Sequence, residues 1–168
     1  MKKQMISWGM ASLLTLSGCA GQYVLPEGSP QATLHIVTKH PFPWISGWRY
    51  YSDSECTDSS SVILGAFSGL YEGEKRVQIR AGTKGYLVVR VRTIGPTVVL
   101  PSGSITTKTG EYCGVQFEIS PVPGRTYRAE QKHSELGHNC GVTIINEDTG
   151  AISIDAKPIA IPINCRLK

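Results

Sequence analysis

The sequence predicts an all-β protein, an antiparallel β-sandwich or alternatively a small β-barrel, with about eight strands. Three observations predict this fold class. Short segments alternate between apolar and polar residues with the period of two that is typical of half-buried strands. Turn residues separate these segments, and the chain contains 18 glycines and 10 prolines. Beyond the N-terminal region, no stretch of about ten residues or more has a helical period.

The first predicted strands are residues 32–38 (ATLHIVT) and 47–52 (GWRYYS), in which apolar and polar side chains alternate. Residues 61–67 (SVILGAF) form a more continuous apolar run, which is typical of a buried strand. Since several such short strands follow one another, we expect a sandwich of the immunoglobulin or transthyretin type.

The first of three predicted hairpins pairs residues 74–80 with residues 86–92 across the turn AGTKG. With Arg80 opposite Tyr86, the apolar side chains of both strands share one face, and a shift of one residue would destroy this match. The other face then carries Arg76, Arg80, Arg90 and Arg92. These arginines suit a phosphate or carboxylate ligand, such as lipid A or a peptidoglycan stem, or form a solvated strand face, which we favour.

The second and third hairpins pair residues 113–119 with 126–132 and residues 140–145 with 151–156. In the second, Ile119 lies opposite Tyr127 across the turn SPVPG. In the third, Ile144 faces Ile152 and Val142 faces Ile154 across the turn NEDTG, so that these apolar side chains point to the core.

The N-terminus has the pattern of an export signal. Lys2 and Lys3 precede an apolar stretch, residues 5–16, that is shorter than the about 20 residues of a transmembrane helix. The stretch ends in Leu16-Ser17-Gly18-Cys19, a tetrapeptide that resembles the lipobox of bacterial prolipoproteins. An uncleaved anchor and an ordinary signal with a chance cysteine are the alternatives.

The lipobox resemblance implies that residues 1–18 are removed and that the Cys19 thiol carries a diacylglyceryl group, with the new amino group acylated as well. Two or three acyl chains hold a protein firmly on a membrane, because each buried CH₂ contributes about 0.8 kcal/mol. Ala20 stands where an aspartate retains Gram-negative lipoproteins at the inner membrane. The resemblance therefore implies the outer membrane, with the protein facing the periplasm.

The mature chain is predicted to hold one domain. Residues 19–31 show no sustained period and contain Pro26, Gly28 and Pro30, which predicts a lipidated and flexible tether. Residues 32–168 are then a single β-sandwich domain, long enough to bury a core.

Four cysteines remain once Cys19 is assigned to lipid, and an even number in an exported domain indicates two disulfides. They are Cys56, Cys113, Cys140 and Cys165. Four cysteines allow three pairings, which the sequence leaves open. Topology favours Cys113–Cys140, which begin two predicted strands, and Cys56–Cys165, which would fix the C-terminal tail.

Aromatic residues gather in the segment HPFPWISGW (40–48), which contains Phe42, Trp44 and Trp48. Aromatics exposed on a loop often mark a surface for a partner or a glycan. They also close the end of a sandwich core, and both alternatives stay open.

Two segments contain the residue types of metal sites, with His133, His138 and Cys140 in one and Asp53, Glu55 and Asp58 in the other. Oxidation of Cys140 to a disulfide would remove the thiolate that zinc needs. The acidic segment lacks the glycine and the distal glutamate of a calcium-binding EF-hand. We therefore expect no metal and no cofactor.

Two further resemblances concern the mature domain. The segments PVPGRTYRAE and CGVTIINEDTG, with Tyr127 and Cys140, resemble small β-sandwich lipoproteins of proteobacteria, which implies the same fold. The segments Ser68-Gly69-Leu70-Tyr71 and Thr83-Lys84-Gly85 resemble the SGxxY and YxxxTKG motifs of C-type lysozyme inhibitors. Here the first tyrosine comes one position early and Ile79 replaces the second.

The net charge of +4, half of which Lys2 and Lys3 supply, is too small to indicate nucleic-acid binding. The chain has no G-x-S-x-G, S-x-x-K, H-E-x-x-H or phosphate-loop motif. We therefore expect a non-catalytic, lipid-anchored protein that binds another envelope component, a protein or peptidoglycan, in a structural or assembly role. The alternatives are an inhibitor of a lytic enzyme such as lysozyme and an envelope hydrolase.

Overall fold

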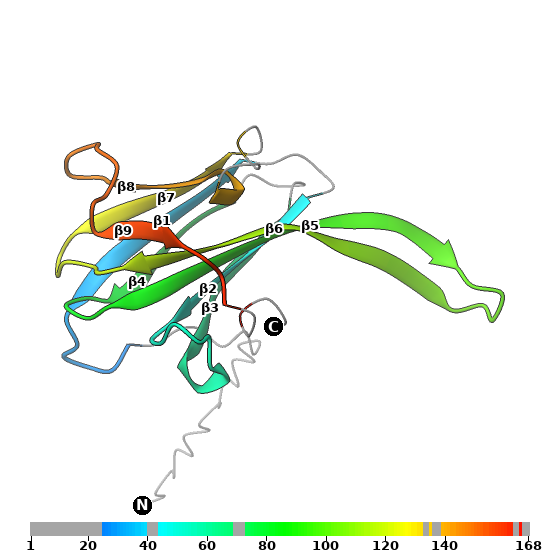
Figure 1. The fold of residues 1–168 in the computed structure, drawn as a ribbon, viewed down its shortest axis with the longest axis horizontal. Coiled ribbons are helices and arrows are strands. Elements are labelled where there is room, and N and C mark those ends of the chain that lie inside the picture. Colours follow the sequence, from blue (N-terminus) through cyan, green and yellow to red (C-terminus); the bar gives the residue numbers. More distant parts are fainter. Residues whose placement is uncertain are drawn as a thin grey trace, which may run out of the picture.

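The computed structural model describes residues 25–39, 44–68, 73–132, 135, 139–162 and 165, and these residues form two β-sheets (Figure 1). Sheet A has the order β4 (Gly73–Arg80), β1 (Gln31–Lys39), β7 (Thr126–Lys132) and β8 (Val142–Asn146). Sheet B has the order β3 (Ser61–Ser68), β2 (Trp44–Tyr51), β5 (Gly85–Val99), β6 (Ile105–Ile119) and β9 (Ala156–Ile159). The predicted all-β sandwich is confirmed.

The core lies between the two sheets because alternate residues of each strand point inward. In sheet A, β1 contributes Leu34 and Ile36, which are fully buried. In sheet B, β5 contributes Leu87, Val89 and Val91 to the same cluster. The residues between them face outward, and we call the two solvent-facing sides the outer faces of sheets A and B.

One strand pair departs from the antiparallel pattern. β1 and β7 run parallel, with Leu34 beside Tyr127 and Ile36 beside Ala129. All four residues are buried, so the centre of sheet A is covered by the core on its inner side. This pair joins two segments far apart in sequence, and no local turn signal could have predicted it.

The predicted segments 32–38, 47–52 and 61–67 all lie in strands, as β1, β2 and β3. The expectation of a buried strand for residues 61–67 is wrong. β3 is an edge strand of sheet B, with Leu64 buried but Ile63 59% exposed.

The predicted hairpin of residues 74–80 and 86–92 is wrong, because the two segments lie in different sheets. β4 pairs with β1, where Arg80 lies opposite Gln31 and Ile79 opposite Ala32. β5 pairs instead with β2 and β6. The turn after β4 carries the chain between sheets and is tied to sheet A by the amide of Ala81, which donates to the carbonyl of Pro30 over 2.8 Å.

The predicted hairpin of residues 113–119 and 126–132 is wrong for the same reason. Ile119 belongs to sheet B and Tyr127 to sheet A, and both point into the core from opposite sides. The apolar alternation that suggested the pairing is the same for two neighbouring strands and for two strands that face each other across a core.

The third hairpin forms, but with a different register. Ile145, rather than Ile144, lies opposite Ile152, and this is a single bridge. Ile152 and Ile154 therefore point to solvent, with 73% and 97% of their surface exposed, while Ser153 is buried. The chain then leaves sheet A, and β9 pairs with β6 in sheet B.

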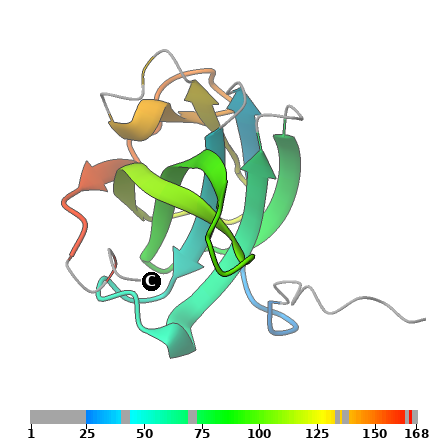
Figure 2. The same ribbon diagram turned by 90° about the vertical axis from the view of Figure 1, so that its right-hand side faces the viewer.

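A two-stranded ribbon, which was not among the predicted elements, projects from the sandwich. β2 pairs with β5 as far as Thr93, which lies opposite Trp44. Beyond Thr93, the described residues provide no further partner for β5 and β6, which pair with each other and are joined by the turn at residues 100–104. We call residues 94–109 the arm. It extends far from the sheets in Figure 1 and points toward the viewer in Figure 2.

Both disulfides favoured by topology are present. Cys113, near the core end of β6, joins Cys140 after β7, so this bond links sheet B to the segment that enters β8 of sheet A. Cys56 joins Cys165 near the C-terminus. Among the described residues, no helix is long and apolar enough to cross a membrane.

Candidate functional site

The four arginines predicted to share one strand face are divided between the two sheets. Arg76 and Arg80 lie on β4 in sheet A, whereas Arg90 and Arg92 lie on β5 in sheet B. The predicted common surface is therefore wrong. Arg90 and Arg92 are joined instead by Arg49 of β2, a residue that the sequence analysis left out.

Arg49, Arg90 and Arg92 line one hollow of about 200 Å³ in the outer face of sheet B, which we call the arginine trough. Its other lining residues are Ile45, Gly47 and Val88. Registers explain the group: Ile45 pairs with Arg92, Gly47 with Arg90 and Arg49 with Val88, so that all six face outward.

Small residues create the hollow. Arg90 has a glycine as its register partner on each side, Gly47 on β2 and Gly114 on β6. Next to Gly47 on the edge strand is Ala66. This row of small residues crosses sheet B, and the Arg90 side chain lies in it with only 9% of its surface exposed.

The C-terminal segment covers the other half of the same outer face. Tyr51, Val88, Cys56 and Cys165 form a small buried cluster there. The Gln116 side-chain amide donates to the carbonyl of Ser54 over 3.3 Å, which holds the loop before Cys56 on the sheet. The arginine trough is thus the part of this face that the Cys56–Cys165 region leaves uncovered.

The trough is basic. Three arginine side chains line it. In the part of the chain that the structure describes, Glu111 is the one acidic residue among their register partners, and its backbone lies opposite Arg92. Arginine stays charged at any working pH, so three positive charges face one small hollow.

The predicted aromatic surface does not form as a unit. Trp48 is fully buried in the core, and its indole N–H donates to the Ser46 hydroxyl over 3.1 Å. Trp44 is partly buried and packs against the same core. Phe42 lies outside the described residues. Of the two alternatives for this segment, closure of the core applies to both tryptophans.

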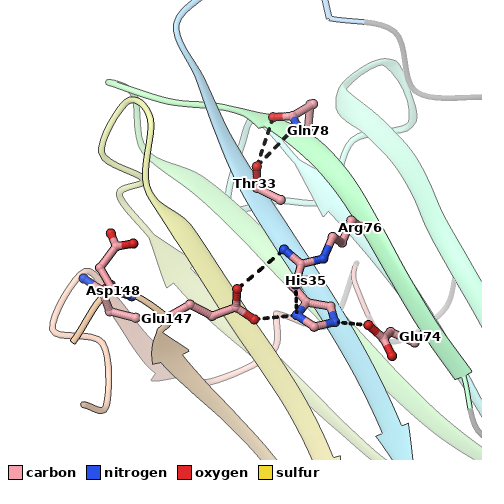
Figure 3. A network of polar contacts seen from close by, with 8 residues as sticks. Thr33, His35, Glu74, Arg76, Gln78, Glu147 and Asp148 are labelled. Carbon is pink, nitrogen blue, oxygen red and sulfur yellow. Dashed lines mark hydrogen bonds and ion pairs between the residues drawn. The ribbon is translucent and has the colours of Figure 1, made fainter. Parts of the chain in front are cut away.

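A second polar group lies on the outer face of sheet A, centred on the buried His35 of β1 (Figure 3). His35 Nδ1 is 2.5 Å from Glu147 Oε1, and Nε2 is 2.7 Å from Glu74 Oε1. Arg76 Nη2 is 3.1 Å from Nδ1, and its Nη1 is 3.5 Å from Glu147 Oε2. Nδ1 can accept a hydrogen bond from Arg76 when it carries no proton, and it can donate one to Glu147 when it carries a proton.

This histidine network links elements rather than exposing a reactive group. Glu147 follows β8 and reaches across β7 to His35, while Glu74 and Arg76 come from β4 on the other side. Both ring nitrogens are engaged, and no hydroxyl or thiol of the described residues is bonded to the ring. A histidine that activates a nucleophile needs such a partner and a free lone pair.

The described residues contain no group of three His, Cys, Asp or Glu side chains that could hold a metal. Asp53, a proposed calcium ligand, instead closes its own loop by accepting from the amides of Glu55 and Thr57 over 2.9 and 3.2 Å. Hydrogen bonds from the hydroxyls of Ser60 and Thr57 hold the pKa of Asp53 below its ordinary value. His133 and His138 lie outside the described residues, and Cys140 is in a disulfide.

The two segments that resemble lysozyme-inhibitor motifs are far apart. Ser68 pairs with Ile45 at one end of sheet B, whereas Gly85 precedes Tyr86, which pairs with Tyr51 at the other end. The distance along the sheet is roughly 20 Å at about 3.3 Å per residue. Lys84 pairs with Glu118 over 3.1 Å, and Lys157 together with Lys84 lowers the pKa of Glu118. The other residues of the first motif, 69–71, lie outside the described residues.

The tip of the arm also exposes apolar side chains. Val99 and Ile105 are opposite each other and are 67% and 71% exposed, and Leu100 is 42% exposed. The turn is closed by the Leu100 amide, which donates to the Ser104 carbonyl over 2.8 Å, and Gly103 has a φ of +77°. Three large apolar side chains thus lie together at the end of the ribbon.

Both the arginine trough and the arm have signals in the amino-acid sequence. Arg49 alternates with Trp48 and Tyr50 in a predicted strand, so its outward direction could have been deduced. The arm sequence is rich in threonine and valine around the turn Pro101-Ser102-Gly103, which is a hairpin signal. Cys19, the predicted lipidation site, lies outside the described residues. Comparisons of this chain with protein-family models, with curated proteins and with solved structures find no match.

Proposed function

We propose that this protein is a non-catalytic, lipid-anchored component of the bacterial envelope that binds another envelope protein through its arm. The observation that carries the proposal is the arm itself, residues 94–109, with Val99, Leu100 and Ile105 exposed at its end. The resemblance of residues 16–19 to a lipobox supports the anchor. The absence of an aspartate at position 20 supports the outer membrane as its site, and we propose that the protein faces the periplasm.

The energetics of the arm favour a protein partner. An isolated two-stranded hairpin is at best marginally stable in water. Within the described residues, neither β2 nor β9 pairs with the ribbon beyond Thr93. A partner that covers the three apolar side chains would remove them from water and contribute about 1.5–3 kcal/mol for each fully buried side chain.

In the part of the chain that the structure describes, no other strand pairs with either edge of the arm, and a strand of a partner could join these edges. Edge strands usually carry charges that prevent such pairing. From residue 94 to residue 109 the arm contains one charged residue, Lys108. A groove or sheet edge with apolar lining is therefore the surface that we expect on the partner.

The histidine network supports a non-catalytic role, because its ring nitrogens are already bonded within the protein. Assays of the purified chain against lysozyme and against peptidoglycan and ester substrates separate this role from inhibition and hydrolysis. We expect background values in all of these assays.

Site-specific photocrosslinking in living cells tests the proposal. A photoreactive residue at Val99 or Ile105 is expected to capture one dominant envelope protein. The same residue at Ile154, which is 97% exposed on the sandwich, is the matched control and is expected to capture none. Equal capture at Ile154, or no capture at the arm, would refute binding through the arm.

An arm-deletion variant separates binding from folding. Thr93 and Gly110 are register partners, so an Asn-Gly turn can replace residues 94–109 and close a two-residue hairpin. No residue of the arm belongs to the described core, so the variant should keep the thermal stability of the parent within a few degrees. It should also lose the partner in pull-down from cells.

The anchor is tested separately with Cys19→Ser. We expect loss of the lipid mass on the N-terminal peptide and release of the protein from the membrane fraction. Retention on the membrane by an unmodified Cys19 would contradict the lipid anchor and favour an uncleaved N-terminal segment.

A further inference from the structure

We propose that the arginine trough binds a phosphate group, either as inorganic phosphate or as the phosphate of an ester such as a lipid headgroup. The trough is formed by Arg49, Arg90 and Arg92 around Gly47. This site is independent of the arm and of the lipid anchor, and it would stand if either were wrong.

The graded burial of the arginines distinguishes the trough from a solvated strand face. Arg90 lies on the floor and is 9% exposed, Arg49 is half-buried, and Arg92 at the rim is exposed. Arginines on a solvated face extend into water, because leaving water is costly for a charged group. Here the row of small side chains, with Gly47 at its centre, lets one guanidinium lie within the surface.

The spacing of the three arginines allows them to contact one anion. Arg90 and Arg92 are two residues apart on one strand face, and Arg49 is the diagonal neighbour of Arg90 across the β2–β5 pair. Such neighbours have Cα atoms roughly 7 Å apart. One anion between guanidinium groups at this spacing can interact with all three of them.

Phosphate fits the three arginines better than a carboxylate does. One carboxylate has two oxygens and a single negative charge. A phosphate monoester has three terminal oxygens and up to two negative charges, so it can accept from three guanidinium groups at once. The hollow of about 200 Å³ has room for this group and part of the molecule that carries it.

Calorimetric titration of the full-length chain in nonionic detergent tests the proposal. The probes are inorganic phosphate, glycerol 3-phosphate and acetate. We expect both phosphates to bind, acetate to bind at least about tenfold more weakly, and affinity to fall as salt is raised. Acetate binding as tight as phosphate binding would overturn the assignment of phosphate.

Gly47→Val is the decisive variant because it fills the trough without changing a charge. An added Cβ at Gly47 meets no atom within 4 Å, so the variant is expected to fold. It should abolish phosphate binding. Arg49→Gln and Arg92→Gln should each weaken binding about tenfold, as loss of one charged hydrogen-bond partner does. Arg80→Gln on sheet A makes the same charge change elsewhere and should leave affinity unchanged.

Two vesicle preparations identify the source of the phosphate. A Cys19→Ser variant, which lacks the proposed lipid, is mixed with vesicles of phosphatidylcholine alone or with added phosphatidic acid. Binding only to the latter, lost in Gly47→Val, assigns the trough to a lipid headgroup. Binding of soluble phosphates alone assigns it to a free phosphate compound. Absence of binding to every probe, or equal binding by Gly47→Val, would overturn the proposal.

Discussion

Single side chains connect the turns of this protein to its core, and Tyr127 is the clearest case. Its buried hydroxyl accepts from the Val122 amide over 3.0 Å and donates to Asp155 Oδ2 over 2.9 Å. Tyr127→Phe leaves both groups without this partner and should destabilise the protein by about 1–3 kcal/mol. Denaturant unfolding measures the effect, with Tyr86→Phe on the other sheet as a control of similar chemistry. An equal loss of stability in Tyr86→Phe would show that the hydrogen bonds of Tyr127 make no special contribution.

The same tyrosine predicts a pH dependence. Burial, followed by the hydrogen bond to Asp155, raises the pKa of Tyr127 above its ordinary value of 10.0. Because the pKa of Tyr127 is higher in the folded state, the protonated hydroxyl contributes fully to folding stability below pH 10.0. This contribution is lost as the pH rises through the pKa of the folded state. Stability of the parent should therefore fall more steeply above this pH than stability of Tyr127→Phe, measured by denaturant titration at each pH.

The two carboxylates of the histidine network should contribute unequally. The side chain of Glu147 is 25% exposed and that of Glu74 is 68% exposed, although both contact the His35 ring. Solvent screens the exposed pair, so Glu74→Gln should cost only a few tenths of a kcal/mol and Glu147→Gln about 1 kcal/mol. Urea midpoints of the two variants give the comparison, and the reverse order would contradict this account.

At the scale of the strands, two glycines of sheet B have opposite constraints. Gly85 faces the core, and a Cβ there would overlap the Tyr50 ring and hydroxyl. Gly47 opens to the arginine trough, where a Cβ has space. Gly85→Ala should cost about 1–3 kcal/mol through overpacking, whereas Gly47→Ala should change stability by less than about 0.5 kcal/mol. Thermal unfolding of both variants checks this difference.

The sequence predicted strands better than it predicted their partners. Alternation in residues 74–80 and 126–132 correctly identified the buried side of each strand, because burial leaves a local pattern. It gave no information on whether the next strand pairs alongside or faces it across the core, so both predicted hairpins were wrong. The arginine trough depends on the β2–β5 pairing, which joins residues about 40 positions apart, and was therefore beyond local pattern analysis.

At the scale of the whole molecule, the two disulfides should differ in their effect. Cys56–Cys165 closes a loop with a sequence separation of 109, and Cys113–Cys140 one of 27. The longer loop restricts the unfolded chain more, so its removal should cost about 1 kcal/mol more than removal of the shorter one. Double alanine variants of each pair, compared by denaturant unfolding, test the order. Intact mass before and after reduction should also show four added hydrogens, two for each of the two bonds.

The parallel pairing of β1 with β7 also sets the order of events while the chain is being made. β1 lies between β4 and β7 in sheet A, so the first strand of the domain stays without its second neighbour until residue 126 and beyond have been produced. The disulfide of Cys56 forms later still, because its partner is at position 165. Contacts of such long range form slowly and late. Sheet A and the Cys56–Cys165 bond therefore cannot be completed until almost the entire chain has been made, which suits a polypeptide that is threaded through a narrow membrane pore before it folds.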